Sequence, residues 1–258
     1  MRDLQLHGAH ALVTGAGRGI GRAIAQRLAD EGCQVTLLGR DSPVLAATAA
    51  QIGPARAYAV VADVTDRAAV EAALAQARAH FGPLRIVVNN AGAAESAPFA
   101  QLDAVQWQRM LDLNLTGAFH VTQAALSDLL AGHGARVVNV ASTAALKGYG
   151  YVAAYVAAKH GLLGLTRALA AEYAQRDLTV NAVCPGYTDT DLLAAAVQTI
   201  AGKTGRSPED ARAELARANP QRRLIRPEEV AAAVAWLCSP AAASVTGQAI
   251  TIDGGEVA

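Results

Sequence analysis

The sequence predicts a single α/β domain built on a doubly wound parallel sheet of about seven strands. Short aliphatic runs alternate with longer helical patterns along all 258 residues, which is typical of strand–helix–strand units. The composition agrees, because 52% of the residues are hydrophobic but only 4% are aromatic. A core of Ala, Val, Leu and Ile suits parallel strands that helices cover on both faces. We find no repeat, low-complexity tract or Gly/Ser linker, so residues 1–258 are expected to form one domain.

Seven aliphatic runs carry the strand pattern. In chain order they are Ala9–Thr14, Gln34–Leu38, Ala57–Ala62, Arg85–Asn89, Arg136–Ala141, Thr179–Val183 and Gln248–Ile252. Amphipathic or Ala-rich stretches separate them and predict helices, among them Gly21–Glu31, Arg67–His80 and Pro227–Leu237. Right-handed crossovers would place successive helices on the two faces of the sheet.

One segment, residues 189–226, is longer than an ordinary connection and looks mostly helical. Connections of this length in compact domains usually serve as lids or binding loops, so we expect a helical substrate lid here. The segment has an excess of basic residues. Against three acidic residues, Glu209, Asp210 and Glu214, it contains Lys203, Arg206, Arg212, Arg217, Arg222, Arg223 and Arg226. Two interpretations are open. The charges are solvated Arg–Glu pairs, or some arginines bind the phosphates of a coenzyme A or carrier-protein thioester.

Bulk properties exclude several classes of protein. A formal net charge of zero argues against binding to nucleic acid or to a membrane surface. The three cysteines form no CxxC pair, and the six histidines show no metal-ligand spacing, so we expect no disulfide framework and no metal. Residues 1–8 lack the apolar stretch of a signal peptide, and no run reaches the roughly 18 apolar residues of a membrane span, which predicts a cytoplasmic protein. A hydrolase is improbable because Ser142 does not stand in a Gly-x-Ser-x-Gly elbow.

A glycine-rich turn follows the first predicted strand and opens a helix. It reads Thr14-Gly15-Ala16-Gly17-Arg18-Gly19-Ile20-Gly21. Glycines let the backbone approach a pyrophosphate, and the helix N-terminus then offers N–H groups and the positive end of its dipole. This context predicts a Rossmann-like dinucleotide site, whereas a P-loop is excluded because no Gly-Lys-Ser/Thr follows.

The end of the second predicted strand bears on which dinucleotide binds. An acidic residue at that tip would bind the ribose 2′-OH of NAD, and an arginine can face the 2′-phosphate of NADP. Gly39 stands at the usual acidic position and Arg40 follows it, which favours NADP(H). Asp41 keeps NAD(H) possible, and Arg40 could simply be a solvated loop residue. Asp63, at the end of the third strand, could reach the adenine or cap the next turn.

Tyr155 and Lys159 form the candidate reactive pair. Residues four apart lie on one face of a helix, so the ammonium is expected beside the phenol. A nearby cation favours the phenolate, and a phenol so tuned can exchange a proton with a carbonyl or alcohol oxygen. Ser142 ends a strand thirteen residues upstream and could hydrogen-bond the same substrate oxygen. Asn114 is an amide in an otherwise apolar helical stretch, and a structural kink filled by water is the alternative interpretation.

Several further motifs complete the pattern: Asp63-Val64, Asn89-Asn90-Ala91-Gly92, Pro185-Gly186 with Thr188, and Asp253-Gly254-Gly255. Together with the glycine turn, Asn114, Ser142 and Tyr155-x3-Lys159, they resemble the short-chain dehydrogenase/reductase family over essentially the whole chain. The resemblance is nearest to ketoreductases that act on 3-oxoacyl thioesters and aromatic polyketide intermediates.

The resemblance implies a tetrad of Asn114, Ser142, Tyr155 and Lys159. Tyr155 would be the acid/base, Ser142 would orient the carbonyl, Lys159 would grip the nicotinamide ribose and lower the pKa of Tyr155, and Asn114 would hold a relay water. It places Asn90 near the adenosine ribose and Thr188 near the carboxamide. The other implied cofactor contacts are Gly15, Gly17, Arg18, Gly19, Ile20, Gly21, Arg40, Asp63, Val64, Ala91, Gly92, Pro185 and Gly186. A homotetramer is implied as well.

The sequence therefore predicts an NAD(P)(H)-dependent oxidoreductase that moves a hydride between nicotinamide and a carbonyl or secondary alcohol. Two alternatives remain: a general alcohol dehydrogenase for small or bulky ketones, and a non-catalytic dinucleotide sensor. A third, a sugar epimerase or dehydratase, is disfavoured because the chain is too short for the substrate domain of such enzymes. The substrate depends on residues 93–96, residues 144–151 and the lid, none of which forms a motif.

Overall fold

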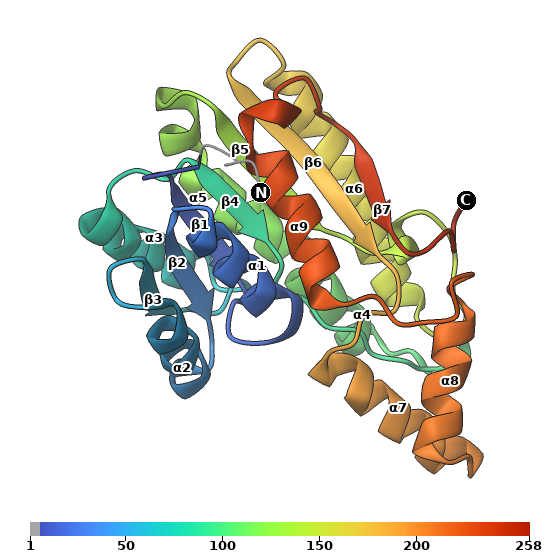
Figure 1. The fold of residues 1–258 in the computed structure, drawn as a ribbon. Helices are drawn as coiled ribbons and strands as arrows, with labels where there is room; N and C mark the ends of the chain where they lie inside the picture. The colour runs from blue at the N-terminus through green and yellow to red at the C-terminus, as the bar shows by residue number, and fades with distance from the viewer. Residues whose placement is uncertain (1–5) are drawn as a thin grey trace.

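The computed structural model describes residues 6–258 and contains one parallel sheet of seven strands in the order β3-β2-β1-β4-β5-β6-β7 (Figure 1). The strands are β1 (His10–Thr14), β2 (Gln34–Gly39), β3 (Ala57–Val61), β4 (Ile86–Asn89), β5 (Ala135–Val140), β6 (Leu178–Pro185) and β7 (Ala249–Ile252). This confirms the predicted doubly wound sheet. The strand order reverses between β1 and β4, and ligands bind such folds at that point, outside the carboxyl ends of the strands.

All seven predicted strands are present, and no end differs from its predicted position by more than two residues. The largest difference is in β6, which continues to Pro185 because residues 182–185 pair with the whole of β7. Every residue of β1, β4, β5 and β6 is buried, as expected for central strands covered on both faces. Residues 1–5, the larger part of the segment that lacks a signal-peptide pattern, lie outside the described chain.

Nine α-helices lie in the described residues: α1 (Gly19–Asp30), α2 (Ser42–Ile52), α3 (Arg67–Phe81), α4 (Ala104–Leu111), α5 (Gly117–Ala131), α6 (Ala153–Glu172), α7 (Asp191–Thr204), α8 (Pro208–Arg217) and α9 (Pro227–Cys238). Local sequence sets many of their ends. Helix α3, for example, begins where the Asp66 carboxylate accepts a hydrogen bond from the Ala69 N–H at 3.1 Å. It ends at Gly82, whose φ of 81° favours glycine.

The helices cover the sheet in two layers. Alternate residues of a strand point to opposite faces, so Val13 of β1 packs against α1 and α9, whereas Leu12 packs against α3 and α5. Ile24 and Leu28 of α1 bury their side chains in the first layer. Each fully buried side chain of this size stabilises the fold by about 1.5–3 kcal/mol. The two layers leave the carboxyl ends of the strands open for a ligand.

Helices α7 and α8 form the predicted helical segment between residues 189 and 226, and Figure 1 shows them projecting beyond the end of the sheet. They share a small apolar cluster of their own around Leu193, Val197 and Ala211. The base of the segment is fixed by a parallel bridge between Thr188 and Ile225, with the Asp189 N–H donating to the Ile225 carbonyl at 2.9 Å. Within residues 6–258, no helix combines the length and apolar character that crossing a bilayer requires.

Candidate active site

A cavity of about 800 Å³ opens at the carboxyl ends of the strands, at the predicted switch point. Most of the predicted cofactor and catalytic residues line it: Gly15, Gly17, Arg18, Gly19, Ile20, Arg40, Asp63, Val64, Asn90, Ala91, Gly92, Asn114, Tyr155 and Lys159. The cavity is also lined by residues that the sequence motifs did not predict, notably Val44 and Leu45 of α2 and Leu192 and Ala195 of α7. The segment 189–226 therefore contributes directly to the wall of this site.

Five predicted residues do not line the cavity: Gly21, Ser142, Pro185, Gly186 and Thr188. Gly21 lies beneath the glycine turn, where a Cβ would stand 2.2 Å from the Gly15 carbonyl oxygen, so its part in the site is close packing. The Thr188 hydroxyl donates to the Gly186 carbonyl at 3.0 Å. These two residues shape the loop after β6 beside the cavity.

The glycine turn and the start of α1 suit a pyrophosphate. The N-cap residue Arg18 makes no side-chain capping hydrogen bond, and the first turn of α1 carries no acidic residue. The first N–H groups of α1 are thus free to bind a ligand, and they lie at the positive end of the helix dipole. Gly15 has a φ of 64°, and a Cβ there would stand 2.9 Å from the Asn90 amide. Side chains at these positions would fill the space above the turn. Glycine keeps it open, so that a phosphate group can approach the backbone N–H groups.

Asn90 holds this turn in place. Its side-chain amide donates to the Thr14 carbonyl at 2.9 Å, while its backbone N–H donates to the Thr14 hydroxyl at 2.9 Å. Asn90 thus ties the end of β4 to the end of β1, and it also lines the cavity. Its position near the adenosine ribose stays a prediction.

Two arginines line the cavity, each beside a carboxylate. The guanidinium of Arg40 lies 3.5 Å from the Asp63 carboxylate, and that of Arg18 lies 3.1 Å from the Asp41 carboxylate. Asp41 also caps α2, where it accepts a hydrogen bond from the Val44 N–H at 3.2 Å. Both oxygens of Asp41 are therefore engaged. Asp63 accepts from the Thr65 N–H as well, and hydrogen bonds with Thr65 and Arg40 lower its pKa despite partial burial.

Tyr155 and Lys159 lie on the first turns of α6, as the four-residue spacing predicts. The Lys159 ammonium is buried and donates to the Val140 carbonyl at the end of β5, at 2.8 Å. It stands 5.6 Å from the centroid of the Tyr155 ring. Ser142, two residues past Val140, hydrogen-bonds the Tyr155 phenol. The structure thus places the Tyr155 phenol and the Lys159 ammonium in the wall of the cavity, and Ser142 directly follows Ala141, which also lines it.

The pKa of Tyr155 differs from the expectation. Burial raises it above its usual value, although the Ser142 hydrogen bond opposes that shift. Burial also lowers the pKa of Lys159 to about 8. Desolvation penalises both charged forms, and here it outweighs the attraction between an ammonium and a phenolate. Burial thus shifts the pKa of Tyr155 in the opposite direction to the one that the Tyr155–Lys159 spacing predicts.

Asn114 stands in a π-helical segment, Asp112–Thr116, which joins α4 to α5. Its amide donates to the Met110 carbonyl at 3.0 Å and to the Ala93 carbonyl at 2.9 Å. The widened π-helical turn and these two hydrogen bonds hold the polar side chain in an apolar stretch. Gly92 lies against it: a Cβ there would be 2.7 Å from the Asn114 Oδ1 and 3.6 Å from the Lys159 Nζ. Gly92 thus lies close to both the Asn114 side chain and the Lys159 ammonium.

A polar cluster beyond Ser142 was not predicted. Glu256, from the tail after β7, bonds the Tyr149 hydroxyl and lies 3.1 Å from the Lys147 ammonium. The Tyr149 hydroxyl also lies 2.7 Å from the Thr143 hydroxyl, next to Ser142. No sequence signal marks these residues, because Tyr149 and Glu256 are 107 positions apart.

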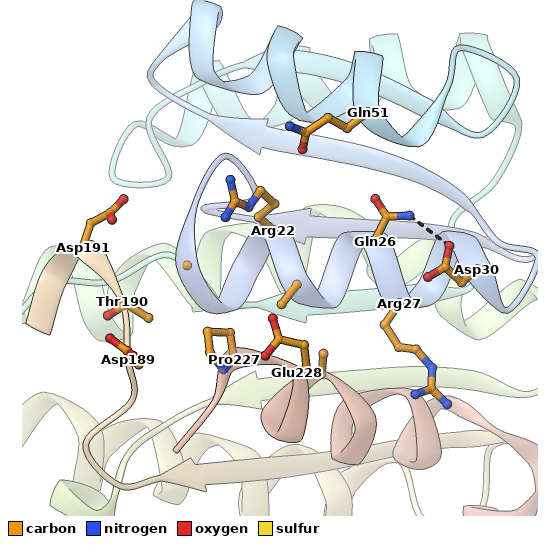
Figure 2. Close-up of a pocket in the computed structure, with 13 residues that line it drawn as sticks. Arg22, Gln26, Arg27, Asp30, Gln51, Asp189, Thr190, Asp191, Pro227 and Glu228 are labelled. Carbon is orange, nitrogen blue, oxygen red and sulfur yellow. Dashed lines mark hydrogen bonds between the residues drawn. The ribbon is translucent and has the colours of Figure 1, made fainter. Parts of the chain in front are cut away.

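A second hollow of about 560 Å³ lies between α1, α9 and the start of the segment 189–226 (Figure 2). It shares Gly19, Thr190 and Asp191 with the main cavity. Its lining mixes charged and amide side chains, and Figure 2 shows Gln26 and Asp30 joined by a hydrogen bond of 2.9 Å. In the described part of the chain, no group of three or more His, Cys, Asp or Glu side chains is placed to hold a metal ion.

The fold and this cavity define a class of enzyme, the nicotinamide-dependent oxidoreductases built on a Rossmann-like sheet. The chain belongs to the short-chain dehydrogenase family, whose sequence pattern matches residues 9–201. It is an oxidoreductase that acts on CH–OH or carbonyl groups with NAD(P), as members of this family do.

Similar proteins cover nearly the whole chain. Cis-4-hydroxycyclohexanecarboxylate dehydrogenase of Sinomonas cyclohexanicum is 41% identical, over 96% of this chain and 96% of the relative. The 3-oxoacyl-(acyl-carrier-protein) reductase FabG of Escherichia coli is 35% identical, over 98% of both chains. A crystal structure of an actinorhodin polyketide ketoreductase variant with NADPH superposes with a TM-score of 0.92 at 38% identity, covering 96% of this chain and 97% of that one.

Proposed function

We propose that this enzyme reduces a ketone to a secondary alcohol with NADPH, and that its substrate is a 3-oxoacyl thioester or a related polyketide intermediate. The observation that carries the reaction is the group of Ser142, Tyr155 and Lys159, of which the last two line the dinucleotide cavity. The substrate class draws support from relatives that are named 3-oxoacyl and polyketide ketoreductases.

In this proposal, NADPH supplies the hydride and the chain supplies the proton. The Ser142 hydroxyl orients the substrate oxygen, and the Tyr155 phenol donates its proton to that oxygen as negative charge builds on it. The raised pKa of Tyr155 keeps the phenol protonated until that moment, which suits reduction. The Lys159 ammonium, held by the Val140 carbonyl, then stabilises the phenolate. Asn114 would hold the relay water close to Lys159.

NADP is the favoured cofactor because the cavity next to the end of β2 carries two guanidinium groups, and the one acidic side chain that follows β2, Asp41, already accepts hydrogen bonds. Arg18 and Arg40 line the cavity, position 39 is glycine, and both Asp41 oxygens are engaged. A 2′-phosphate could take the place of a carboxylate partner on either arginine, and guanidinium groups bind phosphate through two parallel hydrogen bonds.

We predict that Arg40→Ala weakens NADPH binding by about 10-fold or more, and NADH binding by less than about twofold. A hydrogen bond to a charged group contributes about 1.5–3 kcal/mol, and only NADPH has the 2′-phosphate. Fluorescence titration of both cofactors would measure this, with Arg67→Ala as a control because Arg67 forms its exposed ion pair on α3. Equal losses for the two cofactors, or a wild-type preference for NADH, would contradict the NADP assignment.

The lid arginines are mostly paired with acids. Arg212 pairs with Asp189 at 2.6 Å, Arg217 with Glu214 at 2.7 Å, and Arg223 with Glu229 at 2.7 Å. Arg226 also lies near Glu229. Among the described residues, Arg206 and Arg222 make no ion pair, and the Lys203 side chain lies outside the described part. Solvated Arg–acid pairs thus account for most of the local excess of base, and Arg222 is the best candidate for a thioester phosphate.

The substrate class can be tested by salt. If phosphates of coenzyme A meet the lid, kcat/KM for acetoacetyl-CoA falls steeply between 0.1 M and 1 M NaCl, because the Debye length shrinks from about 10 Å to about 3 Å. The value for cyclohexanone should stay flat, and Arg222→Ala should blunt the fall for the thioester. Parallel salt curves would instead identify a simple ketone or alcohol as the substrate.

We also propose a cytoplasmic homotetramer. Helices α4 and α5 expose apolar side chains that a monomer would leave in water, namely Val105, Trp107 and Phe119. An apolar patch of this kind is typical of a protein–protein interface. Sedimentation velocity is expected to give the mass of four chains, and a monomer at micromolar concentration would contradict the proposal.

A further inference from the structure

We propose that Glu256, near the end of the chain, is a positioning residue that fixes the loop 143–151 and, through it, the Ser142 hydroxyl. This inference rests on the proposed site, in which Ser142 orients the substrate oxygen. The loop 143–151 begins directly after Ser142 and ends four residues before Tyr155. Its position therefore bears on both groups that are proposed to meet the substrate.

Glu256 is the acceptor at the centre of the cluster. Its side chain is only 2% exposed, and its Oε1 accepts hydrogen bonds from the Tyr149 hydroxyl and from the Lys147 ammonium, the latter at 3.1 Å. The Lys147 ammonium also reaches the Glu256 backbone carbonyl at 3.4 Å and lies 5.0 Å from the Tyr149 ring centroid. A buried carboxylate is costly unless such donors compensate it. Both donors belong to the loop 143–151. The loop therefore stabilises the buried charge, and the carboxylate in turn fixes the position of the loop.

The direction of the hydrogen bonds links Glu256 to Ser142. A carboxylate can only accept, so the single hydroxyl proton of Tyr149 goes to Glu256. Burial, together with the Glu256 carboxylate, raises the pKa of Tyr149 and keeps that proton in place. The 2.7 Å hydrogen bond between Tyr149 and Thr143 then uses the Thr143 proton. Thr143 is buried and directly follows Ser142, whose Oγ accepts from the Ala144 N–H at 3.1 Å.

The tail that carries Glu256 is a rigid support. The Asp253 carboxylate accepts hydrogen bonds from the Gly255 N–H at 3.0 Å and from the Val257 N–H at 2.9 Å. Gly254 and Gly255 have φ angles of 66° and 94°, which let the chain turn sharply after β7. The Gly186 N–H donates to the Ile252 carbonyl at 3.1 Å, so the turn is also fixed to the loop after β6.

The second carboxylate oxygen, Oε2, is buried and has no hydrogen-bond partner among the described residues. The function of Glu256 in the cluster thus depends on one acceptor atom. Gln at this position keeps that acceptor, whereas Ala removes it and leaves two loop donors without their partner. This difference makes Glu256→Gln the conservative variant and Glu256→Ala the disruptive one.

The test uses the full-length enzyme with NADPH, and with acetoacetyl-CoA and cyclohexanone as substrate probes. Glu256→Ala is expected to lower kcat/KM by about 10–100-fold, because a displacement of about 1 Å at a positioning group can cost about 10²-fold. Glu256→Gln should stay within about fivefold of the wild type. The Kd of NADPH should change by less than about twofold, because no residue of the cluster lines the cofactor cavity.

A double-variant cycle separates positioning from general stability. Tyr149→Phe breaks the same link, so the double variant with Glu256→Ala should be no slower than Glu256→Ala alone. Asp128→Asn is the matched control, since Asp128 lies in the last turns of α5 and its partly buried carboxylate accepts hydrogen bonds from Arg78 at 2.8 Å and from the Leu84 N–H at 3.1 Å. It should lower Tm and leave kcat/KM unchanged. If Glu256→Ala behaves like this control, or if the two losses multiply, the inference is overturned.

Hydrogen–deuterium exchange gives a readout that does not depend on turnover. The amides of the loop 143–151 should exchange faster in Glu256→Ala and at the wild-type rate in Glu256→Gln and Asp128→Asn. Unchanged exchange in Glu256→Ala would overturn the inference by itself. The proposed site has a separate test: an active Tyr155→Phe variant would reject that site, whereas an inactive one together with unperturbed Glu256 variants would reject only the positioning role.

Discussion

Tyr155→Phe is expected to lower kcat for ketone reduction by about 10²–10⁴-fold while the Kd of NADPH stays within about twofold of the wild type. A positioned general acid contributes a rate factor of this size, and the phenylalanine ring keeps the shape of the pocket but has no proton to give. Because burial raises the pKa of Tyr155, the wild-type phenol is protonated throughout the ordinary assay range. Steady-state turnover of acetoacetyl-CoA, together with fluorescence titration of NADPH, would measure both quantities.

Tyr173→Phe provides the matched control, because Tyr173 lies at the opposite end of α6 and packs against the core beneath α3 and α5. The Tyr173→Phe variant also loses a phenolic hydroxyl, but its kcat should equal that of the wild type. A Tyr155→Phe variant that kept most of its turnover would show that another group delivers the proton, and the central proposal would fail.

Gly21→Ala is expected to weaken NADPH binding by about 10–100-fold and to lower Tm. A Cβ at position 21 would stand 2.2 Å from the Gly15 carbonyl oxygen and 2.4 Å from the Asn90 amide, so the turn over α1 has to move. Overpacking of this kind costs about 1–3 kcal/mol, and 1.4 kcal/mol is a factor of ten in affinity. Fluorescence titration and thermal unfolding with and without NADPH would measure the two effects.

Gly132→Ala is the corresponding control, since Gly132 follows α5 with a negative φ and a Cβ there makes only an ordinary contact, 3.6 Å from the Asp128 carbonyl. This variant should bind NADPH like the wild type. If Gly21→Ala bound NADPH equally well, the close packing of α1 under the turn would not shape the dinucleotide site.

Much of the site could be predicted because its signals are local in the chain. The glycine turn stands between a strand and a helix, and Tyr155 and Lys159 are one helical turn apart, so sequence spacing alone places each group. The ends of parallel strands meet at one edge of the sheet, which is why Gly15, Asn90 and Val140 could be expected near one another. The roles assigned to Asn114, Ser142, Tyr155 and Lys159 stay predictions for the variants above to test.

The sequence by itself determined the strand–helix alternation, the doubly wound sheet and the position of the dinucleotide turn, because hydrophobic periodicity and glycine geometry act over a few residues. Only the tertiary structure decided the quantities that depend on burial and on distant partners. Desolvation raises the pKa of Tyr155 and lowers that of Lys159 to about 8, where spacing alone predicted a favoured phenolate. The ion pair of Arg212 joins it to Asp189, 23 positions away, and Glu256 contacts Tyr149 across 107 positions. Electrostatic free energy depends on surroundings in three dimensions, so no local pattern encodes it.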